Sequence, residues 1–598
     1  MSLMSASPSG SASESSSARN TPQTPSASNV RVNELAAETN LDTQTISAHR
    51  VQGAHASMGS WRLVSLCTLL SRIFGLIRDA AMAALFGSGP LLDAFTIAFR
   101  LPNLARVLLG EGVLATAFLP QLLEVEREEG QRSAFRLATA LCILLFGGLS
   151  LAVLFTQLIL LLGVLPWLNN PDNQLLCWLT VYLLPYVVFV CAAAQLSTML
   201  HAFHRFMAAA LIPVVLNLGW LLALALVAWL IESPQIQIQI LALLIVVLGF
   251  IQCLALVPSL WQVGFRYQSD WWQARSKILA TISRMGPILG ALLVLQFSAV
   301  WESALSWLLS ADGTSSAQGV AWLGGIEAPL PSGAATFLYL GQRLYQFPLG
   351  IFGIALGTVL YPLLSRHAQA HDWQAFRSSI SLAARLVLAI GVPASVGLFS
   401  LALPVTDLLF GRGAFDWPAI EQTARVIQTY SVGIWAMCGL VIAQRAFYAL
   451  DDRWTPLNIA FIGTATGMLT GLCSLWWLGT SGLAWGTTVS AIMQVLWNYR
   501  RLYQKIPASE HIPHREPGSS LSVMFLQIAF CNGAMALVCQ SLLWVAGQYF
   551  VSHGSTLDRL MLVMIPMTGS ILVFALTSRL IGYKDPWIVV QRRVSVEP

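Results

Sequence analysis

An unusual set of charged residues lies in an apolar stretch between residues 71 and 122. The set comprises Arg72, Arg78, Asp79, Asp93, Arg100, Arg106 and Glu111. A charged side chain near the centre of a lipid bilayer costs about 2.5–3.5 kcal/mol on insertion scales. Such side chains therefore face one another or a water-filled cavity, and they mark a candidate functional site.

Two opposite-charge pairs in this set have a spacing that suits ion pairing along a helix. Arg72 and Asp79 are seven residues apart and share a helical face, as do Asp93 and Arg100. This spacing keeps a purely structural explanation of the set open. The other arginines have no such local partner, so we expect them to face a polar cavity.

Glycine and proline interrupt the same stretch. Gly87, Gly89 and Pro90 predict a tight turn after a first helix, and Pro102 removes a backbone donor within a second one. Irregular helices at membrane depth are tolerated where they line a cavity, and transporters place their substrate sites there.

The composition is that of a polytopic membrane protein. Of 598 residues, 56% are hydrophobic and only 10% are charged, whereas soluble domains carry about 25% charged residues. The nine cysteines lie in apolar segments without a C-x-x-C pair, and no metal, nucleotide or hydrolase motif is present. We therefore expect no cofactor, no metal site and no nucleic-acid partner.

Fourteen apolar segments are long enough to cross a bilayer, which predicts an all-α fold with about 14 transmembrane helices. The segments are 61–87, 92–123, 134–166, 175–203, 207–232, 238–264, 278–310, 334–364, 378–409, 418–449, 456–477, 480–503, 520–547 and 557–582. A115-T-A-F-L-P-Q-L in the second segment is similar to G357-T-V-L-Y-P-L-L in the eighth, 242 residues later. This repeat predicts two six-helix lobes around a central cavity, with two further helices at the C-terminus.

Basic residues lie in alternate loops, which places both termini in the cytoplasm by the positive-inside rule. The residues before the first segment are rich in Ser, Ala and Thr and are expected to be disordered. The expected parts are a disordered cytoplasmic tail (1–58), an N-lobe (59–266), a C-lobe (267–504), a cytoplasmic linker (505–519), two last helices (520–583) and a cytoplasmic tail (584–598).

The charged stretch resembles the start of the MurJ (MviN) lipid II flippases, in the multidrug/oligosaccharidyl-lipid/polysaccharide exporter superfamily. The resemblance is carried by S-R-x-x-G-x-x-R-D, D-A-F, F-R-L-P-N-L-x-R, G-E-G and A-F-x-P in this order. It implies a flippase of the bacterial inner membrane that moves lipid II to the outer leaflet for peptidoglycan synthesis. The expected driving force is the membrane potential or a monovalent ion. The expected protein partner is the cell-wall synthesis machinery.

The same resemblance implies a headgroup site, because an arginine fork donates two hydrogen bonds to a diphosphate and stays charged. The expected substrate-binding residues are Arg72, Arg78, Arg106, Arg343, Ser71 and Asn103, with Asp93, Glu111 and Glu302 in supporting or coupling roles. Many relatives carry acidic residues around the arginine that matches Arg343. This sequence has Gln342 and Gln346 there, and Glu302 is the candidate replacement for the lost charge.

Three alternatives remain open on sequence grounds. The substrate is another polyprenyl-linked sugar, or the chain is a drug/cation antiporter of the same superfamily, whose cavity would favour acids over arginines. In a different class, Asp451 and Asp452 are candidates for the metal-diphosphate site of a membrane-embedded glycosyltransferase. Because Arg453 follows them, we favour a charge cluster at a helix end.

The alternating loop charges generate a topology test. Reporter fusions at Asn170 and Ser315 are expected to report a location outside the cytoplasm, and a fusion at Lys505 a location inside. An outside signal at Lys505 would refute this topology.

Overall fold

The computed structural model describes residues 63–310, 327–507, 521–550 and 555–587. Leu66–Pro598 forms one compact unit, and the following description concerns that unit. The predicted tail at 1–58, most of the loop at 311–333, most of the linker at 505–519 and the end of the C-terminal tail lie outside the described residues.

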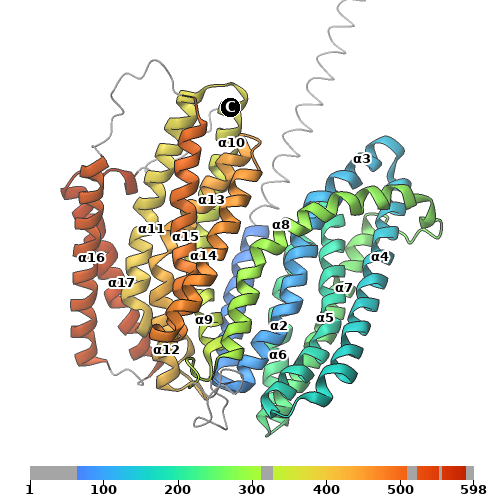
Figure 1. Cartoon of the computed structure of the whole chain (residues 1–598), viewed down its shortest axis with the longest axis horizontal. Helices are drawn as coiled ribbons and strands as arrows, with labels where there is room; N and C mark the ends of the chain where they lie inside the picture. The colour runs from blue at the N-terminus through green and yellow to red at the C-terminus, as the bar shows by residue number, and fades with distance from the viewer. Residues whose placement is uncertain (1–62, 311–326, 508–520, 551–554, 588–598) are drawn as a thin grey trace, which may run out of the picture. The chain divides into compact units, whose positions relative to one another are not determined.

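A first bundle of helices is built from residues 63–262 (Figure 1). It contains a helix over residues 63–86, α2 (Pro90–Ala105), η1 (Arg106–Phe118), α3 (Leu119–Glu129), α4 (Gln131–Leu158), η2 (Ile159–Val164), η3 (Leu165–Trp167), α5 (Pro171–Ala202), α6 (Phe206–Leu230) and α7 (Pro234–Gln262). Its core includes Trp220, stacked edge-on against Phe95 and Phe99 of α2.

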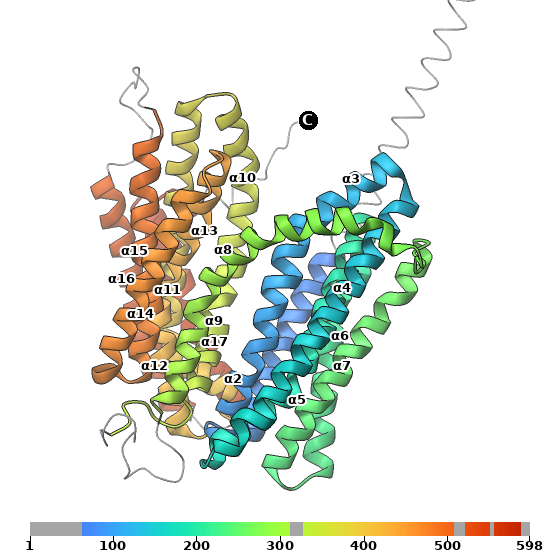
Figure 2. The same cartoon turned by 45° about the vertical axis from the view of Figure 1, so that its right-hand side comes forward.

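A second bundle and a terminal helical hairpin follow (Figure 2). The elements are η4 (Trp271–Ala274), α8 (Arg275–Leu308), α9 (Ala334–Pro348), η6 (Leu349–Gly353), α10 (Ile354–Gln369), α11 (Trp373–Phe410), α12 (Trp417–Val432), α13 (Ile434–Ala449), α14 (Trp454–Leu478), α15 (Thr480–Lys505), α16 (Leu521–Tyr549) and α17 (Thr556–Leu580). Helix α8 joins the bundles: Ile278 near its start is buried with first-bundle residues, and Leu305 near its end is buried with α9 and α12.

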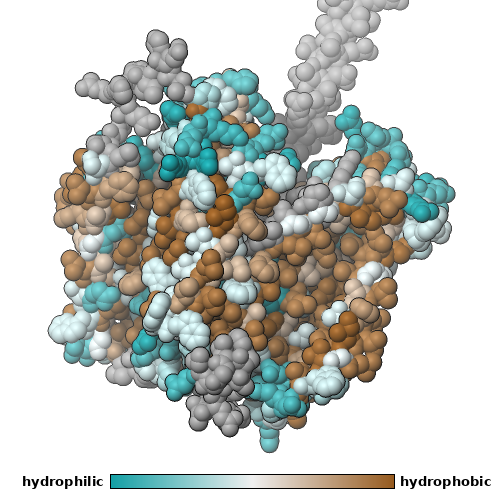
Figure 3. Space-filling model, in the orientation of Figure 1, coloured by the Kyte–Doolittle hydropathy of each residue, from teal (hydrophilic) through white to brown (hydrophobic). Residues whose placement is uncertain are grey.

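The helices have the length and surface of membrane spans. In the described part of the chain, nine helices are long and apolar enough to cross a bilayer, or ten if the bent pair α12 and α13 is one span. Apolar side chains cover the flank of the unit in Figure 3, and hydrophilic ones gather toward its two ends. The all-helical prediction is confirmed. Each of the fourteen predicted segments coincides with a helix or a run of helices, but fourteen membrane crossings are not confirmed.

The predicted repeat has a counterpart in the irregular helices. The π-helical segment η1 begins at Arg106, directly after α2, and the π-helical segment η6 begins at Leu349, directly after α9. The two starts are 243 residues apart, close to the 242 residues between the repeated sequence strings. Inserted π turns are frequent at functional sites.

The Asp451–Asp452 pair lies in the turn between α13 and α14. The Asp452 carboxylate accepts hydrogen bonds from the backbone N–H groups of Trp454 and Thr455, at 3.1 and 3.0 Å, and forms an ion pair with Lys505. Burial opposes its ionisation, but the bonds from Lys505 and Thr455 outweigh this and lower the pKa of Asp452 to about 2. Asp452 therefore binds the start of α14, which fits the charge cluster at a helix end that the sequence favoured.

This geometry separates the two aspartates in a test. Asp451 is exposed and has a positive φ of 55°, a conformation that Asn adopts readily. Asp451→Asn is expected to leave stability and transport unchanged, whereas Asp452→Ala loses a helix cap and about 0.5–2 kcal/mol of stability. Thermal unfolding of the purified variants measures the difference. Turnover of a sugar-lipid donor that Asp451→Asn abolishes would instead establish the glycosyltransferase.

Candidate functional site

A cavity of about 930 Å³ lies among the helix over 63–86, α2, α5, α6, α9 and α11. All six residues predicted to bind substrate line it: Ser71, Arg72, Arg78, Asn103, Arg106 and Arg343. Its other lining residues are largely apolar, among them Leu344, Phe347 and Leu398. The sequence thus located the cavity, and the structure supplies the partners of each charge.

Arg78 is held on every side by buried partners. Its Nη2 and Nε donate to Asp79 Oδ1 at 2.7 and 3.1 Å, and its Nη1 donates to Asn217 Oδ1 at 3.0 Å. The guanidinium also lies 4.5 Å from the ring centre of Trp220, in cation–π geometry. Only 7% of Arg78 is exposed, so this arginine is fixed in place.

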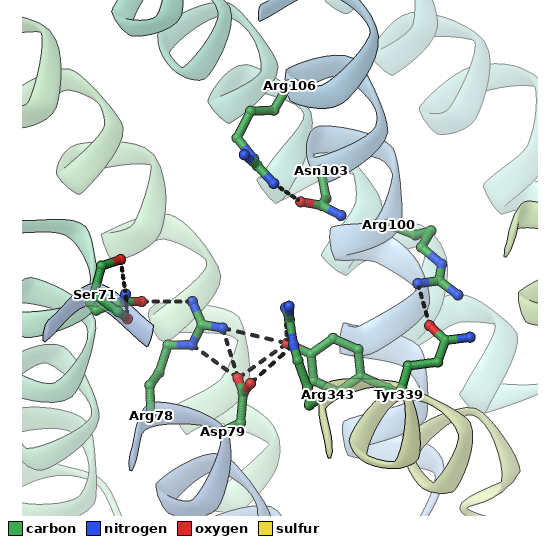
Figure 4. A network of polar contacts seen from close by, with 10 residues as sticks. Ser71, Arg78, Asp79, Arg100, Asn103, Arg106, Tyr339 and Arg343 are labelled. Atoms are coloured by element: carbon green, nitrogen blue, oxygen red, sulfur yellow. Dashed lines mark hydrogen bonds and ion pairs between the residues drawn. The ribbon is translucent and has the colours of Figure 1, made fainter. Parts of the chain in front are cut away.

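Asp79 joins the first bundle to the second. Its Oδ2 lies 3.2 Å from Arg343 Nε, and its Oδ1 accepts a 3.1 Å hydrogen bond from the Tyr339 hydroxyl. Tyr339 in turn accepts a 2.8 Å bond from Arg343 Nη2. The side chains of Arg78, Asp79, Tyr339 and Arg343 converge on one point in Figure 4. One carboxylate therefore serves two arginines from two bundles.

Two polar members of this network were missed on sequence grounds. Asn217 lies in α6, four residues after Pro213, and its Nδ2 donates to the Ser71 carbonyl at 3.0 Å and to the Ser71 hydroxyl at 3.4 Å. A lone amide in an otherwise apolar helix was the available signal. Tyr339 lies one helical turn before Arg343 in α9, a spacing that places both side chains on one face.

Arg72 has no acidic partner among the described residues, although its spacing favoured Asp79. Its side chain is exposed in the cavity, and Asp79 is engaged by Arg78 and Arg343 instead. The Arg72 guanidinium packs against Gly350 in η6, where a Cβ atom would collide with it. Because the end of an arginine side chain is flexible, a side chain at residue 350 would displace the Arg72 guanidinium.

Arg106 lies at the first residue of η1 and faces the same cavity. Its Nη2 donates to Asn103 Oδ1 at 2.9 Å, so the neutral amide orients the guanidinium. In Figure 4 this pair lies apart from the cluster around Asp79. Arg72 and Arg106 thus place two cations in the cavity away from its carboxylate.

Asp93 was expected to support the cavity arginines, but its hydrogen-bond partners lie at the start of α9. It is 2% exposed, and its carboxylate accepts bonds from the backbone N–H groups of Gly333 and Thr336 at 2.9 and 2.8 Å, and from the Thr336 hydroxyl at 2.6 Å. These donors belong to the start of α9, where a carboxylate also complements the helix dipole. Asp93 therefore attaches α2 of the first bundle to the start of α9.

A backbone contact lies beside this attachment. The Ala414 N–H donates to the Ala84 carbonyl at 2.8 Å. Gly413 has a φ of +61°, and a Cβ atom there would collide with the Ala84 carbonyl oxygen. Together with Asp93, this contact forms a seam between the bundles near the start of α9, which we call the α9 seam (Ala84, Asp93, Gly333, Thr336 and Ala414).

The two remaining acidic candidates lie elsewhere. Glu302 on α8 is not a replacement partner for Arg343: its carboxylate accepts bonds from Gln342, at 3.0 Å, and from Thr487 on α15. Glu111 is on η1, and its side chain lies outside the described part of the structure. Among the described cavity-lining residues, four arginines stand against a single carboxylate.

This excess of cations indicates an anionic ligand. Planar guanidinium groups donate paired hydrogen bonds to phosphate oxygens, and the low dielectric of a membrane interior strengthens such bonds. The apolar remainder of the wall suits a ligand with an oily portion. The geometry therefore fits an amphiphile that carries a phosphate or diphosphate.

Comparisons with known proteins find a family model and curated relatives that match this chain. A family model described as "Lipid II flippase MurJ" matches residues 82–561. A probable lipid II flippase MurJ of Vibrio cholerae is 29% identical over 454 residues, which cover 74% of this chain and 82% of the relative. A lipid II flippase MurJ of Burkholderia cenocepacia is 29% identical over 463 residues, with 74% and 84% covered.

Two solved structures share the fold. One, titled "Lipid II flippase MurJ, inward closed conformation", has a TM-score of 0.66 and 20% identity, and the match covers 88% of this chain and 99% of that one. The other, an inward-facing multidrug transporter of the MATE family, has a TM-score of 0.55 and 13% identity, with 73% and 95% covered.

Proposed function

The chain belongs to the lipid II flippase MurJ family, and we propose that it moves lipid II from the inner to the outer leaflet by alternating access. It is a multi-pass protein of the bacterial inner membrane. The observation that carries the proposal is the cavity in which four arginines meet one aspartate. Lipid II supplies the missing negative charge through its diphosphate.

The cavity arginines have two roles in this proposal: some bind the diphosphate first, and Arg343 links the two bundles. Among the described residues Arg72 has no acidic partner, so it is ready to bind the diphosphate first, and Arg106, whose guanidinium Asn103 orients, faces the same cavity. Arg343 reaches the headgroup only by loosening its 3.2 Å contact with Asp79. Binding of substrate thereby weakens a link between the bundles, which couples occupancy of the cavity to their movement.

The loop charges assign the two ends of the unit. If the basic loops are cytoplasmic, the α9 seam is at the outer end, and both chain termini are at the inner end. The contacts of Asp93 with Gly333 and Thr336 then close the outer side. This arrangement supports a state in which the cavity serves the inner leaflet.

The lipid tail needs an apolar route beside the cavity. Leu398 and Leu409 of α11 line the cavity, and α16 and α17 pack against the same helix. We assign the polyprenyl chain to this side, where α11 separates the cavity from the terminal hairpin. A drug/cation antiporter is less favoured, because organic cations would be repelled by the excess of arginines.

The charge of the cavity bears on the energy source of transport. Membrane potential is favoured as the driving force, because a cavity with excess positive charge responds to the field across the bilayer. Glu302 remains the candidate coupling carboxylate for a monovalent ion, and it lies outside the cavity lining. Contact with the cell-wall synthesis machinery would place released lipid II beside its consumers.

The four arginines are tested by conservative replacement. Lysine keeps the charge but lacks the fork, and a hydrogen bond to a charged group is worth about 1.5–3 kcal/mol, or roughly tenfold or more in binding. Arg72→Lys, Arg78→Lys, Arg106→Lys and Arg343→Lys are each expected to insert normally and fail to replace a depleted lipid II flippase in cells. Arg72 is included because Asp79 does not shield it.

The matched control is Arg425→Lys on α12, outside this cavity, which is expected to support growth fully. Membrane levels are quantified for every variant, because loss of a buried partner is itself destabilising. Full growth with all four cavity variants would mean that the arginines are structural.

A further inference from the structure

Arg100 occupies the position in the first bundle that Arg343 occupies in the second. The two arginines are 243 residues apart, and the starts of η1 and η6 are separated by the same 243 residues. Each arginine therefore lies six residues before a π-helical segment. Arg343 contacts Asp79 of the other bundle, so Arg100 is expected to contact the other bundle as well.

Arg100 also crosses between the bundles, but its direct partners are neutral. Its Nε donates to Ser303 Oγ at 2.9 Å and its Nη2 to the Ala299 carbonyl at 3.2 Å, both on α8. Its Nη1 donates to Gln342 Oε1 on α9 at 3.4 Å. A half-buried guanidinium in a membrane needs a counter-charge as well as neutral acceptors.

Gln342 connects Arg100 to that counter-charge. The same amide that accepts from Arg100 donates through Nε2 to Glu302 Oε2 at 3.0 Å. Glu302 is 8% exposed, and its other oxygen accepts from the Thr487 hydroxyl on α15. Arg100 and Glu302 are close enough to interact electrostatically. The acid belongs to the second bundle, because Leu305 on the same part of α8 is buried with α9 and α12.

Each bundle thus contributes one arginine that interacts with a carboxylate of the other bundle. Arg343 of the second bundle pairs with Asp79 of the first, and Arg100 of the first reaches Glu302 of the second through Gln342. We propose that Arg100, Gln342 and Glu302 form a second link, the Arg100 latch, which holds the bundles together in the state with a closed α9 seam. None of the three residues lines the substrate cavity.

The latch differs from the Asp79 link in what releases it. Arg343 lines the cavity, so bound headgroup competes directly for it, whereas Arg100 lies outside the lining. The latch therefore opens only when α2 moves away from α8 and α9. It sets how readily the outer end opens after the cavity is filled, and its residues position the bundles and do not bind substrate.

The test measures the outer end directly by the distance between two spin labels. Trp167 at the end of the first bundle's η3 and Trp477 at the end of α14 are 81% and 82% exposed, and each is replaced by cysteine for labelling. Cys473→Ser removes the one exposed native cysteine. Double electron–electron resonance on the full chain in lipid nanodiscs then reports the separation of the bundles.

Arg100→Met and Glu302→Gln are each expected to shift the main distance population to longer values. The double variant Glu302→Gln/Gln342→Glu, called the relocated pair, moves the carboxylate from residue 302 to residue 342, beside Arg100. It is expected to restore the shorter distance. A residue needed only for folding would not be rescued by moving the charge. Arg425→Met, on α12 outside the latch, is the control and is expected to change nothing.

Unchanged distances in both single variants, or no recovery in the relocated pair, would overturn the latch. If Arg100→Met fails to fold, Glu302→Gln and the relocated pair decide the question, because they change few atoms. The inference rests on the alternating-access function proposed above. Lipid II transport is measured on the same samples, so a wild-type protein without transport would count against the function while the distances still decide the latch.

Discussion

The structure depends on the cost of keeping charge inside a membrane. Asp79 meets this cost for two arginines at once, because it pairs with Arg78 in its own helix and with Arg343 from the other bundle. An isolated buried charge of either sign would be strongly unfavourable, so the two bundles are drawn together at this point. Among the described lining residues, Asp79 is the only carboxylate beside four arginines, which leaves the cavity with an excess of positive charge.

In the proposed function, that imbalance lets one site hold the bundles together and also bind substrate. A bound diphosphate would supply oxygen acceptors to the arginines. It would therefore compete with the contact between Arg343 and Asp79 that links the two bundles. The irregular segments η1 and η6 lie beside these arginines, with Arg106 starting one and Gly350 of the other packed against Arg72. In the proposed function, the ligand would therefore bind where the two bundles are linked.

Sequence reasoning located the cavity residues because charge is so rare in this chain that each arginine is conspicuous. Pairings were harder to predict, since helical spacing ranks only neighbours within one helix. It favoured Arg72 for Asp79 and Arg100 for Asp93, whereas Arg343 and the start of α9 come from elsewhere in the chain. Asn217 and Tyr339 were missed for the same reason. The apolar segment at 418–449 is bent between α12 and α13. No proline lies at this bend, so there was no reason on sequence grounds to divide the segment into two helices.

Recognition of the diphosphate by arginine forks distinguishes this proposed flippase from a carrier of any anionic lipid. The most direct measurement is transport by the purified protein in vesicles, with lipid II compared with an analogue that carries the same sugar and tail on a monophosphate. Lipid II is expected to reach the opposite leaflet roughly tenfold faster than the monophosphate analogue, or more, because the analogue loses a charge-assisted hydrogen bond. Equal rates for the two lipids, or no movement of lipid II, would contradict it.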